Sequence, residues 1–358
     1  MTTTDTHTVD EGRLEQLLGQ AVTDMGAAMN GVLVMLGSEL GLWRGLMGAG
    51  PLTAAELAQR AGIPEKYVHQ WLATQAGSGY VDYDAARGTF TLSPEQALAF
   101  ADESSPAYLV GGYHIVSALY RDRPRIVDAM RAGRGFGWHE HDPEMFLGTE
   151  QFFRPGYRSN LISAWIPALD GVEEKLRAGA TVADIGCGHG VSTILMAQAY
   201  PASTIRGFDY HPASVERATA LAAAEGAAAN ASFGVASAKD YPGDGYDLVC
   251  FFDCLHDMGD PVGALRHTHE ALAPDGTVML VEPYAGDSLT DNLNPVGRVF
   301  YAASTIICTP CSLAQEVGAG LGAQAGERRL REVAEQAGFT RFRRATETPF
   351  NLVLEARP

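Results

Sequence analysis

The sequence predicts an α/β protein with a doubly wound, seven-stranded, mostly parallel sheet that follows a smaller helical domain. From residue 181 onward, short apolar runs alternate with helical stretches, which is typical of parallel strands joined by crossover helices. The last two apolar runs are joined only through Thr348-Pro349. Because this connection is too short for a crossover helix, the two runs form a hairpin and place one antiparallel strand in the sheet.

The elements of this second half follow from apolar periodicity. Strands are expected at 181–186, 203–210, 231–236, 246–253, 276–283, 339–347 and 350–356, with helices at 191–200, 213–225, 260–272 and 327–337. Ligands of open parallel sheets bind outside the carboxyl ends of the strands. Polar residues that directly follow these strands are therefore the first candidates for a functional site.

The first hundred residues predict helices followed by a short hairpin. Helices are expected at 14–46 (one or two), 54–61 and 65–75, and strands at 80–83 and 89–92. Thr53 and Glu56 form a capping box ahead of the second helix, and Pro64 opens the third. This order is the pattern of a winged helix-turn-helix domain.

Composition excludes several classes of protein. The chain has 358 residues, 46% of them apolar, and a formal net charge of −17, which repels nucleic acid and anionic lipid. The opening residues 1–12 lack the basic and apolar regions of a signal peptide, and the apolar run 31–37 is too short to span a bilayer. Five cysteines, an odd number, favour a reducing, cytoplasmic setting.

Residues 181–190, Thr-Val-Ala-Asp-Ile-Gly-Cys-Gly-His-Gly, carry the most specific pattern. A strand ends in Asp184, and Gly186, Gly188 and Gly190 follow before a helix. The glycines allow a tight turn and let a ligand lie against bare backbone, while the helix amino terminus adds amide donors. A second acid, Asp209, ends the next strand 19 residues after Gly190, close to the spacing of a ribose ligand in dinucleotide folds.

Asp-x-Gly-x-Gly-x-Gly resembles the first motif of class I S-adenosylmethionine-dependent methyltransferases, and the terminal hairpin is a further point of resemblance. The resemblance implies S-adenosylmethionine as the cofactor, with Asp184 near its ammonium group and Asp209 on its ribose hydroxyls. Ser237 stands where the family often has an aspartate that accepts from the adenine amino group. The full set of cofactor residues implied is Asp184, Gly186, Cys187, Gly188, Gly190, Asp209, Tyr210, Ser237, Ala238, Phe252 and Asp253.

Leu255-His256-Asp257 follows the fourth strand and resembles a segment of the two-domain O-methyltransferases in which the histidine is the general base. That resemblance makes His256 the base and implies that two acids, Glu282 and Glu327, orient it. The alternative for His256 is a loop histidine that only closes over the cofactor. Glu327, at a helix start, could instead complement the helix dipole.

The same resemblance predicts the domain organisation and the acceptor. Residues 1–104 are expected to form a winged-helix dimerisation domain, 105–175 a helical linker that roofs the substrate pocket, and 176–358 the catalytic domain. The acceptor is expected to be a small molecule methylated on a hydroxyl, with carbon and nitrogen acceptors left open. The segment 289–325 is expected to complete the roof.

Two further hypotheses concern histidines and the winged helix. His139 and His141 lie beside acids and could bind a metal, but a third ligand is lacking, so a pocket loop is favoured and no metal is predicted. Residues 1–105 hold five Lys or Arg against thirteen Asp or Glu, and the expected recognition helix offers only Lys66 and His69. DNA binding is therefore disfavoured and a homodimer is expected, with a cofactor-binding transcriptional regulator as the alternative.

Overall fold

The computed structural model describes residues 9–358; residues 1–8, which include most of the segment used to exclude a signal peptide, lie outside it. The chain divides into two compact units between Ser117 and Ala118, inside helix α6 (Val110–Ala132). Each unit has its own core and is described separately below.

The first unit contains helices and one small hairpin, as the sequence predicts. Its elements are α1 (Glu11–Glu39), α2 (Leu42–Leu46), α3 (Ala54–Ala61), α4 (Glu65–Gly77), β1 (Asp82–Asp84), β2 (Thr89–Thr91) and α5 (Pro94–Phe100). The expected capping box of Thr53 and Glu56 begins α3. The core centres on Trp43 and Trp71, whose rings meet edge to face at 4.6 Å between centroids.

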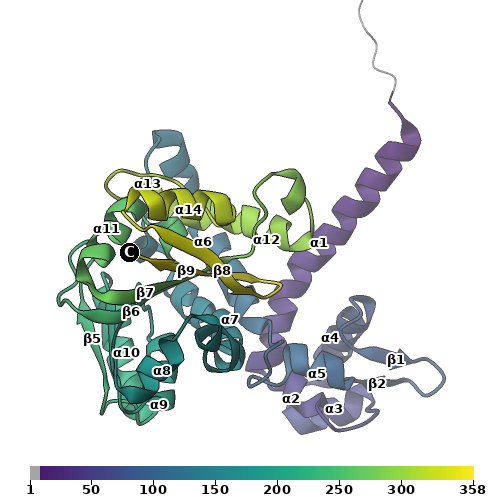
Figure 1. Ribbon diagram of the computed structural model, residues 1–358. Coiled ribbons are helices and arrows are strands. Elements are labelled where there is room, and N and C mark those ends of the chain that lie inside the picture. Colours follow the sequence, from purple (N-terminus) through teal and green to yellow (C-terminus); the bar gives the residue numbers. More distant parts are fainter. Residues whose placement is uncertain (1–8) are drawn as a thin grey trace, which may run out of the picture. The chain divides into compact units, whose positions relative to one another are not determined.

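The second unit is built on a seven-stranded sheet (Figure 1). Its strands are β3 (Thr181–Ile185), β4 (Thr204–Asp209), β5 (Ala231–Val235), β6 (Tyr246–Phe252), β7 (Leu272–Pro283), β8 (Arg341–Glu347) and β9 (Asn351–Arg357). They lie in the order β5-β4-β3-β6-β7-β9-β8, and β9 pairs antiparallel with both neighbours while the other pairings are parallel. The predicted fold, including the terminal hairpin, is confirmed.

Helices cover both faces of this sheet. The helices of the second unit are α7 (Pro143–Asn160), α8 (Val172–Ala178), α9 (Val191–Ala199), α10 (Pro212–Ala224), α11 (Pro261–Ala271), α12 (Pro295–Ala303), α13 (Thr309–Leu313) and α14 (Gly326–Gln336), with single-turn segments at Trp138–Glu140, Leu161–Trp165, Ile166–Ala168, Leu255–Asp257, Thr290–Asn292 and Ser304–Cys308.

Alternate residues of the central strands build two separate cores. Val182 and Leu248 face a cluster that includes Trp165 and residues of α8 and α9. Ala183 and Val249, one position along, face a second cluster with residues of α11 and α14. Both faces of a central strand are therefore apolar, which explains why these strands read as continuous apolar runs.

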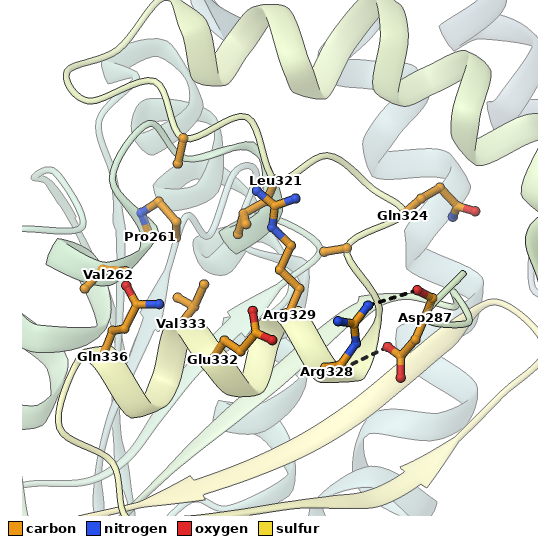
Figure 2. A pocket seen from close by; sticks show the side chains of 12 residues that line it. Pro261, Val262, Asp287, Leu321, Gln324, Arg328, Arg329, Glu332, Val333 and Gln336 are labelled. Carbon is orange, nitrogen blue, oxygen red and sulfur yellow. Dashed lines mark hydrogen bonds between the residues drawn. The ribbon is translucent and has the colours of Figure 1, made fainter. Parts of the chain in front are cut away.

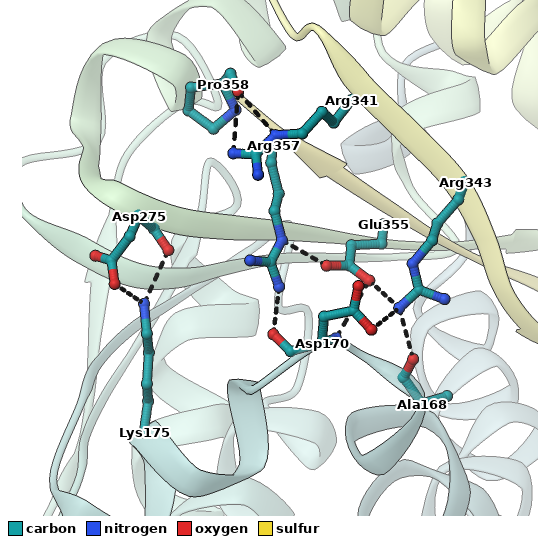
Figure 3. A network of polar contacts seen from close by, with 9 residues as sticks. All are labelled: Ala168, Asp170, Lys175, Asp275, Arg341, Arg343, Glu355, Arg357 and Pro358. Carbon is teal, nitrogen blue, oxygen red and sulfur yellow. Dashed lines mark hydrogen bonds and ion pairs between the residues drawn. The ribbon is translucent and has the colours of Figure 1, made fainter.

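A network of charged side chains joins the terminal hairpin to the turn before α8 (Figure 3). Arg343 pairs with the buried Glu355 and with Asp170, and Arg357 donates from Nε to Glu355 at 2.6 Å. A buried carboxylate is tolerated only when paired, so the two guanidinium groups hold the edge of the sheet against this turn.

Two helical stretches are long and apolar enough to cross a membrane by length and composition, Glu11–Glu39 and Pro295–Leu313. Core helices of soluble proteins pass the same test, so it is weak evidence of a membrane span.

Candidate functional site

The glycine turn lies at the carboxyl end of β3, where the predicted site was expected. Gly186, Gly188 and Gly190 have φ values of 71°, 52° and 79°, a region that side chains with a Cβ rarely adopt. The amides of Gly186 and Cys187 both donate to the carbonyl of Phe208, at 2.8 and 3.1 Å. A Cβ on Gly190 would lie 2.6 Å from the Phe233 ring, whereas one on Gly188 would meet nothing within 4 Å. Open space therefore lies over Gly188.

Asp184 presents one free oxygen in a buried site. Ser192 and Thr193, in the first turn of α9, donate their hydroxyl protons to its Oδ2, both at 2.6 Å. Its Oδ1 is buried and has no hydrogen-bond partner among residues 9–358. Burial raises the pKa of Asp184 to about 6. An orphaned carboxylate oxygen fits a bound ammonium group, which would satisfy it.

Asp209 ends β4 and braces the glycine turn. Its Oδ2 accepts from the amide of Gly188 at 2.9 Å, and its Oδ1 accepts from the amide of His211 at 2.8 Å. The residue is only 7% exposed, and burial raises its pKa. Each carboxylate oxygen accepts one of these hydrogen bonds and has two lone pairs, so each retains a lone pair that suits a ribose hydroxyl.

Ser237 keeps the acceptor capacity that an adenine amino group requires. Its hydroxyl donates to Asp240 Oδ1 at 2.8 Å and accepts from the amide of Lys239 at 3.3 Å. One lone pair therefore remains. Ala238 is partly buried beside it, and Tyr210, 42% exposed, stands after Asp209.

His256 and Glu282 are brought together, as the sequence predicts, although they are 26 residues apart. His256 Nδ1 lies 2.6 Å from Glu282 Oε2, and Glu282 Oε1 accepts from the amide of Leu255 at 3.0 Å. Burial disfavours the charged imidazole, but the Glu282 carboxylate and the neighbouring Cys308 thiol outweigh it and hold the pKa of His256 well above its ordinary value. The imidazole therefore binds a proton strongly.

Asp253, the residue directly after β6, is held by two residues that the sequence did not indicate. Tyr157 donates its hydroxyl to Asp253 Oδ2 at 2.9 Å, and Asn351 donates to Oδ1 at 2.8 Å. The backbone of Asp253 has a φ of 51°, a strain of about 1–3 kcal/mol that is common at functional sites. Burial raises the pKa of Asp253, and that of Asp257, to about 7. Phe252, one residue before, packs on the Tyr157 ring at 5.4 Å.

Glu327 engages arginines rather than His256. Its Oε1 accepts from Arg331 and its Oε2 from Arg344, at 2.8 and 2.7 Å. Within residues 9–358 no hydrogen bond joins Glu327 to His256. Both of its oxygens already have a cationic partner.

A second contact on the glycine turn was missed by sequence reasoning. His189, between Gly188 and Gly190, places Nδ1 2.6 Å from Glu150 Oε2 on α7. Glu150 also pairs with Arg154. No local sequence pattern connects positions 39 residues apart, so only the tertiary structure shows that α7 contacts the glycine turn.

His139 and His141 do not converge on a metal. The His139 ring meets the Tyr210 ring edge to face at 6.0 Å, whereas His141 Nδ1 lies 2.7 Å from Asp122 Oδ2. Over the described part of the chain, no group of three or more His, Cys, Asp or Glu is arranged to hold a metal ion.

A separate groove of about 560 Å³ lies between α11 and α14 (Figure 2). Its walls carry Arg328, Arg329 and Glu332, and Arg328 is bonded to Asp287 at the start of α14. None of the predicted site residues lines it.

Comparison with known families identifies both parts of the chain. Residues 176–338 match the model of a methyltransferase domain, and residues 28–101 match that of an Rv2258c-like winged helix-turn-helix domain. The second unit is thus a methyltransferase domain of the class I, S-adenosylmethionine-dependent type, preceded by a winged-helix domain. The predicted resemblance, fold class and cofactor are confirmed at this level.

Among curated proteins, trans-aconitate 2-methyltransferase of Streptomyces avermitilis is 32% identical over 123 residues, which cover 34% of this chain and 46% of that protein. The chain spans about half or less of the length of the curated relatives that it matches first.

Solved structures share the fold over nearly the full length. Human N-acetylserotonin methyltransferase, solved with S-adenosylmethionine, aligns with a TM-score of 0.71 at 18% identity and covers 100% of this chain and 99% of its own. Mitomycin 7-O-methyltransferase aligns with a TM-score of 0.67 at 22% identity, and the alignment covers 97% of this chain and 100% of that protein. At these identities the likeness establishes the two-domain fold.

Proposed function

We propose that this protein transfers a methyl group from S-adenosylmethionine to a hydroxyl group of a small molecule, with His256 as the general base. The observation that carries the proposal is the buried Glu282–His256 pair, 2.6 Å apart, at the carboxyl ends of β6 and β7, the two strands that follow β3 in the sheet order. Carbon and nitrogen acceptors fit the same scaffold and are the alternatives to a hydroxyl acceptor.

The residues at the ends of β3 and β4 fit the cofactor. The free Oδ1 of Asp184 suits its ammonium group, the open space over Gly188 suits its methionine part, and the remaining lone pairs of Asp209 suit its ribose. When bound, the cofactor supplies an electrophilic methyl group on a sulfonium. Asp184 and Asp209 would also stabilise the positive charge of the sulfonium by electrostatic attraction at short range.

His256 is suited to take the proton from the acceptor hydroxyl. Glu282 occupies Nδ1, so Nε2 is the ring nitrogen that would take the proton, and the raised pKa makes the imidazole a strong base once it is neutral. Proton removal by a positioned base contributes about 10²–10⁴-fold. The remaining acceleration comes from alignment of the acceptor by the surrounding helices.

The test is transfer of a labelled methyl group to a panel of hydroxylated aromatic compounds. We expect turnover by the native chain and about 10²–10⁴-fold less by His256→Ala, with affinity for S-adenosylhomocysteine unchanged by calorimetry. His69→Ala, an exposed histidine on α4, serves as the matched control. Full activity of His256→Ala would exclude His256 as the general base. Failure of the native chain to bind S-adenosylhomocysteine would exclude the proposed methyltransferase activity.

The winged-helix domain supports a dimer better than DNA binding. Along α1, apolar side chains recur at spacings of three and four residues, and all are more than a third exposed: Leu18, Val22, Met25, Met29, Val32 and Leu36. Such a stripe is the seam of a helix pair, and a second copy of the same helix would bury it.

Val22→Glu together with Met29→Glu places two charges in this seam, so the double variant should be monomeric by light scattering if the native chain is a dimer. A regulator function predicts instead a gel shift with genomic DNA fragments. The acidic first unit argues against that outcome. With its five cysteines free, the protein is expected to work in the cytoplasm.

A further inference from the structure

A second buried carboxylate–imidazole pair lies outside the Glu282–His256 pair. His141 Nδ1 is 2.7 Å from Oδ2 of Asp122, a residue of α6, and neither side chain has exposed surface. Asp122 also accepts from the amide of Asp142 and pairs with Arg125. The other ring nitrogen of His141, Nε2, is buried and has no partner among residues 9–358. A buried polar atom left without a partner costs about 1–3 kcal/mol, so a ligand that satisfies it is a direct explanation.

The environment determines which kind of partner Nε2 requires. Burial alone would raise the pKa of Asp122, but the hydrogen bonds from His141, Asp142 and Arg125 outweigh it and hold that pKa low, so the carboxylate is ionised. Burial lowers the pKa of His141, which keeps the imidazole neutral. An ionised carboxylate only accepts, so the single ring proton is on Nδ1. Nε2 therefore carries a lone pair and accepts a hydrogen bond.

Aromatic rings pack against the imidazole that carries this nitrogen. The Phe136 ring meets the His141 ring edge to face at 4.8 Å, and the Trp138 ring meets it at 5.9 Å. Phe146 extends the same surface, 5.2 Å from Trp138. Flat apolar walls with one convergent polar atom are typical of a small-molecule site.

The segment that carries His141 reaches both halves of the methyl-transfer site. Toward the cofactor, the His139 ring meets Tyr210, and the Phe146 ring stacks on His211 at 4.9 Å; both partners directly follow Asp209. Toward the base, the amide of Phe136 donates to the carbonyl of Pro310 at 2.9 Å, two residues after Cys308, the neighbour of His256.

We propose that His141, oriented by Asp122, anchors the methyl acceptor, and that its Nε2 accepts a hydrogen bond from a hydroxyl group on an aromatic ring. This inference rests on the proposed function and narrows its substrate class from small hydroxyl compounds to hydroxylated aromatics. His141 is a binding and positioning residue, since the proton transferred in the reaction goes to His256.

The test compares 1-naphthol with naphthalene, which lacks the hydroxyl, on the full chain saturated with S-adenosylhomocysteine. In His141→Asn, the shorter amide can still donate to Asp122 but leaves the place of Nε2 empty. In His141→Gln, the amide oxygen reaches that place and can accept. We expect His141→Asn to lower the affinity for 1-naphthol about tenfold or more and His141→Gln to recover part of that loss. Naphthalene should bind to the native chain and to both variants with the same affinity. His69→Asn is the matched surface control.

Nitrogen NMR of labelled histidine gives a readout that a purely structural role would not move. The Nε2 resonance of His141 should shift with 1-naphthol and stay in place with naphthalene. Equal binding of 1-naphthol by the native chain and His141→Asn, or no binding by the native chain, would overturn the anchor. In either case intact binding of S-adenosylhomocysteine would leave the proposed function standing, whereas loss of that binding in the native chain would remove the function itself.

Discussion

The replacement Glu282→Gln tests whether the carboxylate sets the proton affinity of His256. The change keeps the size of the side chain and an oxygen that can accept from the Leu255 amide, but removes the negative charge 2.6 Å from Nδ1. An opposite charge at such a distance typically shifts a pKa by about 1–3 units. Burial lowers the pKa of His256, and in the variant the Glu282 charge no longer opposes this effect, so the pKa should fall.

The assay is the pH profile of kcat/KM with an acceptor identified in the labelled-methyl screen. A base must be neutral to take a proton, so the native rate rises with pH through the raised pKa of His256. For Glu282→Gln the acidic limb of the profile should move about 1–3 pH units toward lower pH. The plateau value of kcat/KM should fall by less than the factor of about 10²–10⁴ that a general base contributes, because His256 is still present. Glu335→Gln, an exposed residue of α14, should leave the profile unchanged. An acidic limb that stays in place in Glu282→Gln would refute the assignment.

Three other outcomes follow from the site geometry. Asp209→Ala should lower the affinity for S-adenosylhomocysteine at least tenfold by calorimetry. The change removes an acceptor for the ribose hydroxyls and leaves the Gly188 amide without its carboxylate partner. Gly190→Ala should lower the melting temperature of the free protein more than Gly188→Ala, since only the former brings a Cβ to 2.6 Å from the Phe233 ring; equal losses would contradict the geometry. The folded state holds a proton on Asp257 up to a pH of about 7, so stability should fall as pH rises from about 4 to 7, and Asp257→Asn should flatten this fall in thermal melts.

Much of the fold was predictable because its signals are local. The strands and crossover helices follow from apolar periodicity within ten or so residues, and the short link at Thr348-Pro349 forced the hairpin. The glycine turn was equally visible, since its three positive φ values require glycine at fixed positions. His256 and Glu282 were paired through the resemblance to the two-domain O-methyltransferases; His256 follows β6 and Glu282 lies at the carboxyl end of the neighbouring strand β7.

Other parts of the site depend on residues that no local pattern connects. Tyr157 reaches Asp253 across 96 positions, and Asn351 does so across 98. The carboxylate of Glu327 was expected near the base, yet two arginines engage it, because the strand β8 brings Arg344 beside the start of α14.

The sequence by itself determined the class of fold, the glycine turn and the kind of nucleoside that it suits, because these depend on backbone conformations and strand ends that neighbouring residues dictate. Only the tertiary structure decided which side chains are buried, and with burial came the charge state of each acid and imidazole. The contrast between the two histidines shows the reason: a carboxylate lies within 2.7 Å of each, yet the pKa of His256 is raised and that of His141 lowered, according to the charges and apolar rings that the rest of the chain folds around them.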